Sequence, residues 1–292
     1  MIGKGSFGQV YHAMNAETGE FFAVKQIEYS PSQINKQVLG LLRSLSLEIQ
    51  LLRDLENENV VQYLGFQVTE CSINIFLEYV SGGSIKSLIK QHGPLADPVV
   101  RSFMKQISNG LEYLHERNIL HRDIKGANIL VDCSGVCKIS DFGISRRTSD
   151  GTAEVNSRMS MAQGTWLWMA PECAKTTDYT SKVDIWSLGC VMLEMWTGKP
   201  PWDPLDSTQV LFKLTSNEQP SLPTDLYDDG MDLLMLLLEI NPEKRITAKQ
   251  AGEHRFCEVP QDYSYETFYE PKATPTWTAS SATTAVPTAS TH

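Results

Sequence analysis

A polar loop at residues 121–128, followed at once by a short apolar run at residues 129–131, constrains this chain more than any other feature. The loop reads His-Arg-Asp-Ile-Lys-Gly-Ala-Asn and the run reads Ile-Leu-Val. A hydroxyl that attacks a phosphoanhydride needs a carboxylate to accept its proton, a cation beside the phosphoryl group and an oxygen ligand for a metal ion. Asp123, Lys125 and Asn128 carry these groups in that order. The apolar run predicts a strand that anchors the loop.

Length and composition fit an ordinary enzyme. The chain has 292 residues, of which 41% are hydrophobic, and this is enough for one large domain or for two lobes around a cleft. The formal net charge is −10 and the sequence pI is about 5.1. Binding of nucleic-acid phosphates needs clustered Lys and Arg, which this acidic chain lacks. We therefore expect no nucleic-acid partner.

The six cysteines stand without a recognisable secretory signal ahead of them. This pattern predicts free thiols in a cytoplasmic protein. Cys133 and Cys137 lie close together, but no second pair of Cys or His stands at ligand spacing, so zinc is disfavoured. The longest strongly apolar run, residues 185–193, is too short to cross a bilayer. It predicts a buried helix, and we expect no membrane partner.

Residues 1–80 favour strands. The runs 10–13 and 21–25 are rich in β-forming residues and are joined by a polar connection that contains a glycine. Apolar residues recur at helical spacing between Leu41 and Leu55, which predicts one amphipathic helix in this part of the chain.

After the double glycine Gly82-Gly83 the pattern changes to long helices, predicted at residues 103–117, 182–197 and 231–240. We expect an α+β protein with two lobes: a small β-rich lobe at residues 1–80 and a larger helical lobe at residues 81–258. A cleft between two such lobes commonly binds small ligands.

Residues 259–292 are predicted to form a disordered tail. From Ala273 to His292 the chain contains only Ala, Thr, Ser, Pro, Val, Trp and His. Such a segment cannot bury enough apolar surface to offset its loss of chain entropy.

A glycine-rich turn opens the chain, with Gly3, Gly5 and Gly8 separated by Lys4 and by Ser6-Phe7. Its backbone can approach phosphate oxygens closely because three positions carry no side chain. Taken alone, the motif fits an ordinary hairpin equally well. A dinucleotide-binding fold would need a helix directly after the glycines, whereas residues 10–13 favour a strand.

Lys25 stands inside an apolar strand, where its ammonium group needs a partner. Glu48, within the predicted helix, is the natural candidate. The simpler alternative is an exposed edge lysine, but the apolar neighbours on both sides disfavour it.

Asp141 precedes Phe142-Gly143, shortly after the loop that contains Asn128. Together the two side chains offer oxygen ligands to a magnesium ion. An aspartate before Phe-Gly can also be a simple turn residue.

These motifs together resemble a eukaryotic protein kinase over residues 2–256. The resemblance implies that ATP and Mg²⁺ bind between the lobes, that Asp123 is the catalytic base and that Lys125 contacts the phosphate. It makes Asn128 and Asp141 the magnesium ligands. It also makes Lys25 and Glu48 a catalytic ion pair. The implied ATP-binding residues are Ile2, Gly3, Lys4, Gly5, Ser6, Phe7, Gly8, Val10, Ala23, Lys25, Leu77, Glu78, Val80 and Leu130.

Further positions match the same family downstream. They include Glu172 within Ala-Pro-Glu, Asp184 within the predicted buried helix and Arg245. The family pairs Glu172 with Arg245.

The wording of the motifs narrows the class. Lys125 and Thr165 are typical of serine/threonine kinases, and the Lys-Gly-Ala-Asn and Trp-Met-Ala-Pro-Glu strings resemble fungal MAP kinase kinase kinases. The resemblance implies that the protein substrate is a MAP kinase kinase. We expect the chain to be a monomer or to form transient complexes. The p21-activated and germinal-centre kinases share part of this wording and remain alternatives. A scaffold that keeps the fold without catalysis is the rival class.

Regulation is expected in the segment between Asp141 and Glu172. Phosphate on Ser160 or Ser157 would pair with Arg122 and Arg146 and order the segment. The alternative is that these serines are ordinary polar loop residues.

Two departures from the family affect these expectations. The chain starts one residue before the glycine-rich turn, so we expect the first strand to be truncated and the lid over ATP to be frayed. Trp166-Leu167 replaces the usual Pro-Tyr pair, which puts substrate docking in doubt rather than phosphoryl transfer.

Overall fold

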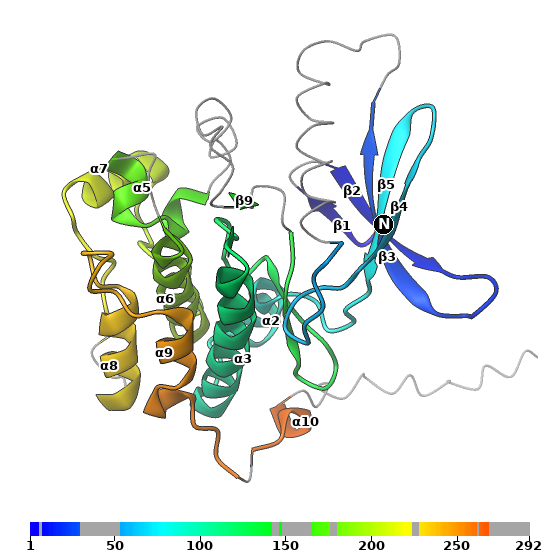
Figure 1. Ribbon diagram of the computed structural model, residues 1–292. Helices are drawn as coiled ribbons and strands as arrows, with labels where there is room; N and C mark the ends of the chain where they lie inside the picture. Colours follow the sequence, from blue (N-terminus) through cyan, green and yellow to red (C-terminus); the bar gives the residue numbers. More distant parts are fainter. Residues whose placement is uncertain are drawn as a thin grey trace, which may run out of the picture.

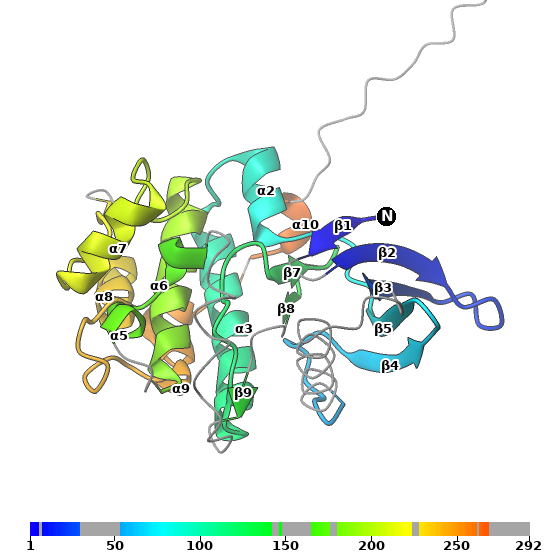
Figure 2. The ribbon, with the colours of Figure 1, turned by 90° about the horizontal axis from the view of Figure 1, so that it is seen from above.

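The structure is a computed structural model that describes residues 1–5, 8–29, 53–141, 146–147, 165–175, 180–223, 228–261 and 263–268. Figures 1 and 2 show a twisted sheet beside a larger group of helices. The predicted α+β architecture with a β-rich N-lobe and a helical C-lobe is confirmed.

The N-lobe is a five-stranded antiparallel sheet in the order β1-β2-β3-β5-β4. Its strands are β1 (Gly3–Gly5), β2 (Gly8–Met14), β3 (Phe21–Glu28), β4 (Tyr63–Val68) and β5 (Ser72–Glu78). The two strands predicted around residues 10–13 and 21–25 are β2 and β3. At the sheet edge β1 has three residues, and Ile2 N donates to Val10 O at 2.8 Å. Truncation of the first strand stays a prediction.

Strand β3 shows why a lysine can be buried here. Ala23, Lys25 and Ile27 alternate along the buried face of the strand. Lys25 lies opposite Val10 of β2 and Ile75 of β5, so its stem packs between apolar neighbours. The prediction of an interior lysine, rather than an exposed edge residue, is confirmed.

The helix predicted at residues 41–55 lies almost entirely outside the described residues, and Glu48 with it. Leu55, at the end of that range, is buried.

The C-lobe is built around two central helices, α3 (Asp97–Glu116) and α6 (Lys182–Thr197), which pack against each other. Around them lie α2 (Ile85–His92), α5 (Pro171–Lys175), α7 (Ser207–Thr215), α8 (Asp228–Leu237), α9 (Ala248–Gly252) and the 3-10 turns Thr165–Trp168 and Arg255–Cys257. Figure 1 shows α9 beside α3, the helix pair with the most extensive contact.

Helix α6 has the bounds that the sequence predicts. Every residue from Val183 to Met195 is buried, so the helix is covered on all sides. The two carboxylates within it, Asp184 and Glu194, must therefore find partners inside the protein.

Other helices differ from the predicted ranges. Helix α3 begins at Asp97 rather than 103, because Pro98 is favoured in a first helical turn. Helix α8 spans Asp228–Leu237 rather than 231–240. The sequence prediction missed α2, α7 and α9, each of which starts with a capping box.

The C-lobe also contains two small antiparallel ladders. β7 (Ile129–Val131) pairs with β8 (Cys137–Ile139), and β6 (Ile119–Leu120) pairs with β9 (Arg146–Arg147). The strand predicted at residues 129–131 is therefore confirmed. Its partner β8 leads directly towards Asp141.

The tail predicted at residues 259–292 begins too early in the sequence, because part of this range is folded. A short helix, α10 (Tyr265–Phe268), follows Val259, and Tyr265 is only 5% exposed. Its ring lies 5.8 Å from that of Phe103 in α3. Tyr265 belongs to the hydrophobic core of the C-lobe, and the partly buried Tyr263 packs against the same core. Residues 273–292 lie outside the described residues.

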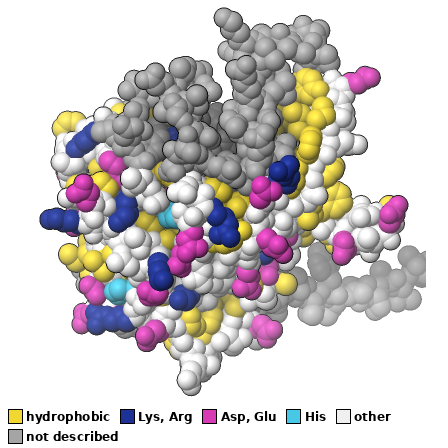
Figure 3. Space-filling view, in the orientation of Figure 1, with side chains coloured by type: hydrophobic (Ala, Val, Ile, Leu, Met, Phe, Trp, Pro, Cys, Tyr) yellow, Lys and Arg dark blue, Asp and Glu magenta, His cyan; other side chains and the backbone are white. Residues whose placement is uncertain are grey.

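Acidic and basic side chains are interspersed over the face of the C-lobe in Figure 3. In the part of the chain that the structure describes, no helix combines the length and apolar character needed to cross a membrane.

Candidate active site

Asp184 of α6 binds the backbone of the loop at residues 121–128. The backbone N–H groups of His121 and Arg122 donate to the two oxygens of Asp184 at 2.9 and 2.7 Å, and His115 Nε2 lies 2.9 Å from Oδ2. Burial alone would raise the pKa of Asp184, but these hydrogen bonds and the nearby histidines lower it below its ordinary value. Asp184 therefore stays ionised and fixes the backbone of the loop.

Arg122 adopts a left-handed backbone conformation with φ of 68°. Such a conformation costs a non-glycine residue free energy and persists where surrounding contacts enforce it. The two hydrogen bonds to Asp184 enforce it here, because they fix the N–H groups of His121 and Arg122, directly before Asp123.

The carboxylate of Asp123 lies between two donors. Lys125 Nζ is 2.8 Å from both carboxylate oxygens, and Asn128 Nδ2 is 2.8 Å from Oδ2. Asn128 Nδ2 also donates to the Asp123 carbonyl at 2.8 Å. Asp123 and Asn128 are buried, at 7% and 6% exposure. The three residues predicted to act together are therefore in direct contact.

Ser140 connects this loop to Asp141. Its backbone N–H and its hydroxyl both donate to Asn128 O at 2.9 Å, and its carbonyl lies 3.0 Å from His121 Nε2. Asp141 therefore follows a residue that is tied to both ends of the loop. The predicted proximity of Asn128 and Asp141 is explained by these contacts.

Lys25 of β3 reaches Asp141, with its Nζ 3.0 Å from Oδ1. Burial tends to raise the pKa of Asp141, but the charge of Lys25 and its hydrogen bond outweigh burial and lower it. Glu48, the predicted partner of Lys25, lies outside the described residues.

The chemistry of Asn128 and Asp141 fits a hard divalent cation. Asn128 donates from its side-chain nitrogen to Asp123, and its side-chain oxygen Oδ1 accepts no hydrogen bond from the described residues. Asp141 engages Lys25 through Oδ1. These oxygens suit Mg²⁺, which takes few protein ligands and completes its shell with phosphate and water. Among the described residues, no group of three or more His, Cys, Asp or Glu side chains is placed so that it could hold a metal ion.

Two of the residues predicted to form the adenine walls, Val10 and Ala23, lie on one face of the N-lobe sheet. Cross-strand pairs place Val10 opposite Lys25, and Ala23 opposite Leu77, so these side chains share the face that carries Lys25. Gly3 pairs with Val10 and Gly5 with Gly8 at the same end of the sheet. Ser6, Phe7 and the side chain of Lys4 lie outside the described residues.

The segment that joins the lobes, residues 79–84, runs close to β7. Val131 N donates to Gly83 O at 2.8 Å, and Ser84 forms a bridge with Leu130. A Cβ atom on Gly82 would lie 2.5 Å from Val131 O, so this position requires glycine. Val80 is buried at the start of this segment. These contacts place Leu130 of β7 beside the segment that joins the lobes.

Two contacts at the site were not predicted. Glu194 of α6, only 4% exposed, accepts hydrogen bonds from Gly126 N at 3.1 Å and from Trp168 Nε1 at 3.0 Å. Burial raises the pKa of Glu194, although these hydrogen bonds partly oppose the shift. A glutamate at the end of an apolar helical run was the available signal. Glu194 connects the loop to the turn that begins at Thr165.

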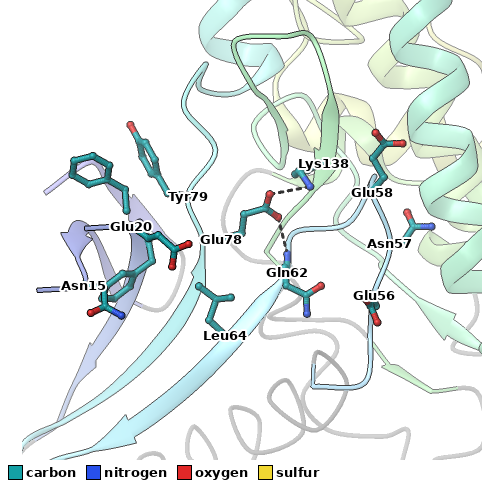
Figure 4. Close-up of a pocket in the computed structure, with 12 residues that line it drawn as sticks. Asn15, Glu20, Glu56, Asn57, Glu58, Gln62, Leu64, Glu78, Tyr79 and Lys138 are labelled. Atoms are coloured by element: carbon teal, nitrogen blue, oxygen red, sulfur yellow. Dashed lines mark hydrogen bonds and ion pairs between the residues drawn. The ribbon is translucent and has the colours of Figure 1, made fainter. Parts of the chain in front are cut away.

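The second unpredicted contact lies behind the joining segment. Glu78 accepts from Lys138 Nζ at 2.9 Å and from Gln62 N at 3.1 Å, as the dashed lines in Figure 4 show. The side chain of Glu78 therefore binds β8 and the residue directly before β4.

Glu172 and Arg245 form the predicted pair. Arg245 donates from two nitrogens to the two oxygens of Glu172, at 2.6 and 3.1 Å. Arg245 is 1% exposed and also donates to the carbonyl of Lys182 at 2.7 Å and to that of Glu239 at 2.8 Å.

The proposed phosphorylation sites Ser157 and Ser160 lie outside the described residues, and so does the side chain of Thr165.

Comparison with known proteins gives the family. Residues 1–257 match the protein kinase domain. The chain is 46% identical over 273 residues to the serine/threonine-protein kinase BCK1/SLK1/SSP31 of Saccharomyces cerevisiae, covering 91% of this chain and 18% of that protein. It is 41% identical over 279 residues to the MAP kinase kinase kinase mkh1 of Schizosaccharomyces pombe, covering 91% and 25%. It is 43% identical over 258 residues to mitogen-activated protein kinase kinase kinase 3 of Arabidopsis thaliana, covering 87% and 41%.

The chain thus spans less than half the length of each of these relatives. The domain match takes in the loop, the Lys25–Asp141 pair and the Glu172–Arg245 pair within one family pattern. On this basis the chain belongs to the protein kinase family.

Proposed function

We propose that this chain transfers the γ-phosphoryl group of ATP to a serine or threonine hydroxyl of a protein. The observation that carries the proposal is the Asp123 carboxylate, held by Lys125 and Asn128 in a loop whose backbone is fixed by Asp184. A carboxylate in this place accepts the proton of the attacking hydroxyl.

The other residues have roles that follow from their charges. Lys125 lies beside Asp123 and contacts the transferring phosphoryl group, and Lys25 binds the α and β phosphates. Asn128 and Asp141 hold Mg²⁺, which when bound neutralises charge on the phosphates. Glu48 completes the pair with Lys25. Adenine lies between the walls formed by Ile2, Val10, Ala23 and Leu130, with the backbone of Glu78 and Val80 at its edge and Leu77 behind it. The glycine-rich turn covers the phosphates.

The substrate of this reaction is a MAP kinase kinase, and the chain acts in the cytoplasm. The support is the similarity to proteins named MAP kinase kinase kinases in fungi and in a plant. The Lys125-Gly126-Ala127-Asn128 wording agrees with a serine/threonine acceptor.

A transfer assay tests the proposal. The chain is mixed with Mg²⁺, labelled ATP and a catalytically inactive MAP kinase kinase, and it is compared with Asp123→Asn. Loss of the general base should reduce the rate by at least about 100-fold. Equal rates would refute the assignment of Asp123. Nucleotide binding without transfer by either protein would indicate a scaffold.

A further inference from the structure

The β7–β8 hairpin carries the two proposed magnesium ligands at its open end. Asn128 lies directly before β7, and Asp141 follows Ser140 after the end of β8. The turn of the hairpin, residues 132–136, forms the opposite end. Each strand has three residues, so at about 3.4 Å per residue the turn lies roughly 10 Å from the ligands. A tilt of the hairpin at its turn therefore moves both ligands.

A side chain from beyond the kinase domain covers this turn. The domain match ends at residue 257, whereas Tyr265 belongs to α10, at the lower edge of the C-lobe in Figure 1. A Cβ atom added to Gly135 would lie 2.4 Å from Cγ of Tyr265, so the ring rests directly on the backbone of the turn. The same ring packs beside Phe103 of α3. Tyr265 therefore joins the turn to α3.

Gln106 of α3 binds the hairpin at the same end. Its Nε2 donates to Gly135 O at 3.0 Å, and its Oε1 accepts from Cys137 N, at the start of β8, at 2.8 Å. Gln106 follows Phe103 by three positions, so the two side chains lie on the same face of α3. The turn is therefore held against α3 by the hydrogen bonds of Gln106 and by the ring of Tyr265.

The hairpin is bonded along its whole length. One edge of β8 pairs with β7, and the other binds Asn59, which donates from Nδ2 to Cys137 O at 3.0 Å and accepts from Ile139 N at 2.9 Å. At the open end, Ser140 donates from its N–H and its hydroxyl to Asn128 O. The hairpin therefore moves as one body, and the position of its turn affects the position of its ligands.

We propose that Tyr265 is a positioning residue for magnesium: by covering Gly135 it holds the β7–β8 hairpin against α3 and so fixes the places of Asn128 and Asp141. This inference rests on the proposed function, because that function assigns the two ligands. Tyr265 acts through the hairpin and does not touch the metal ion. Residues that orient metal ligands from outside the coordination shell commonly change metal affinity by about 10- to 100-fold.

Nucleotide binding measured against Mg²⁺ concentration tests the proposal without catalysis. The full chain is titrated with the fluorescent nucleotide mant-ADP over a series of Mg²⁺ concentrations, which gives the Mg²⁺ concentration that produces half of the gain in affinity. Tyr265→Ala should raise this half-effect concentration about tenfold, because the ligands are no longer fixed. The affinity for mant-ADP in EDTA should be unchanged. Tyr265→Phe keeps the ring over Gly135 and should match the unchanged chain.

Phe256→Ala separates positioning from a general loss of stability. Phe256 is fully buried in the 3-10 turn that packs against α3 and α8, and its ring contacts Trp196 of α6. F256A and Y265A each remove a buried aromatic ring, so both should lower the unfolding temperature. Only Y265A should raise the half-effect concentration of Mg²⁺, and hydrogen exchange of residues 129–141 should be faster in Y265A than in F256A. An equal rise in both variants would overturn the proposal.

Gln106→Met decides the question if Y265A does not fold. Methionine keeps the length of the side chain and leaves Tyr265 in place, but it removes the hydrogen bonds to Gly135 and Cys137. Q106M should raise the half-effect concentration of Mg²⁺ in the same direction as Y265A. The proposal is overturned if Q106M retains the value of the unchanged chain, or if Y265F raises it as much as Y265A does.

The unchanged chain provides the separate test of the proposed function. If Mg²⁺ does not strengthen its binding of mant-ADP, Asn128 and Asp141 are not magnesium ligands, and the proposed function fails together with this proposal. If Mg²⁺ strengthens binding equally in the unchanged chain, in Y265A and in Q106M, the proposed function stands and only the positioning role of Tyr265 is overturned.

Discussion

Lys25 Nζ lies 3.0 Å from Asp141 Oδ1, although the two residues are 116 positions apart in the chain. The side chains are 6% and 22% exposed, so the pair is only partly screened by solvent. The contact joins β3 of the N-lobe to the residue after Ser140, which is itself bound to Asn128. The lobes are therefore connected at the point where phosphate and metal are proposed to bind.

Replacement of Lys25 by methionine should abolish most activity while preserving the fold. The methionine keeps the apolar stem, but the cation that faces the phosphates is lost. Removal of one group that stabilises charge in a transition state costs about 10²–10³ in kcat. Steady-state transfer assays should show this loss, and circular dichroism should show unchanged folding. Lys90→Met, at an exposed lysine in α2, is the control and should retain full activity. A K25M protein within a few-fold of the unchanged chain would contradict the role of Lys25.

Loss of the Glu172 carboxylate should strongly destabilise the C-lobe. Arg245 is 1% exposed, so removal of Glu172 leaves a buried cation without its counter-charge. Glu172→Ala should lower the free energy of unfolding by about 3–5 kcal/mol. Urea denaturation followed by tryptophan fluorescence measures the change.

The double variant E172A/R245M makes this test sharper. It no longer buries an unpaired cation, so it should recover part of the stability lost in E172A. Glu243→Ala, at an exposed glutamate, should change stability by less than about 0.5 kcal/mol. A double variant that is less stable than E172A would show that the packing of Arg245, not its charge, dominates.

Local sequence determined the parts of the site that lie close together in the chain. Asp123, Lys125 and Asn128 fall within six residues, so the proximity of these three residues could be predicted from their spacing. The turn that follows brings β8 back beside β7. The end of α6 was predictable because the helix is followed by a glycine, Gly198, with φ of 69°.

Some errors came from signals that the sequence does contain. Asp206 followed three residues later by Gln209 is a capping box, and it marks the start of the missed helix α7. Pro98 likewise marks the first turn of α3.

Other features depend on contacts between distant residues. Nothing near Tyr265 in the sequence indicates that its ring will pack against Phe103, and nothing near Glu194 indicates Gly126 and Trp168 as its donors. Such contacts are decided by how complete elements pack together, and local patterns do not encode them.

Glu194 should be replaceable by glutamine but not by alanine. Gly126 N and Trp168 Nε1 both donate to Glu194 Oε2, and a glutamine carbonyl can accept from the same direction. Alanine would leave two buried donors without an acceptor, at about 1–3 kcal/mol each. E194A should therefore unfold at clearly lower urea concentration than E194Q. Equal destabilisation by both would show that the ionised carboxylate itself is required.

The pH dependence of stability gives a second test of Glu194. Because its pKa is raised in the folded protein from the ordinary value of 4.5, the folded state binds the proton more tightly than the unfolded state. This contribution to stability is fully present below 4.5 and is lost as pH rises through the raised pKa. Glutamine does not titrate, so the loss should be absent in E194Q. Unfolding curves measured in steps from pH 4 to pH 8 should show E194Q gaining relative to the unchanged chain as pH rises. Parallel profiles would contradict the raised pKa.

Tyr265 should contribute to stability as a core residue, although it lies beyond the predicted domain end at residue 258. The Tyr265 ring covers Gly135, in the turn that joins β7 to β8, where an added Cβ would lie 2.4 Å from the ring. Gly135 has φ of 86°, and its carbonyl accepts from Gln106 Nε2 at 3.0 Å. This turn connects the strand after Asn128 to the strand before Asp141. Tyr265→Ala should therefore cost about 3–5 kcal/mol, as for other buried aromatic residues, and Gly135→Ala about 1–3 kcal/mol through strain at positive φ.

Truncations separate the contribution of α10 from that of the residues after it. A chain that ends at Lys272 keeps Tyr265 and should unfold at the same temperature as the full chain. A chain that ends at Glu258 lacks Tyr265 and should unfold at a temperature lower by roughly the same amount as Tyr265→Ala, because both expose Phe103 and Gly135. Differential scanning calorimetry on the four proteins makes the comparison. If the chain ending at Glu258 is as stable as the full chain, α10 is not part of the folded domain, and the boundary at residue 258 is restored.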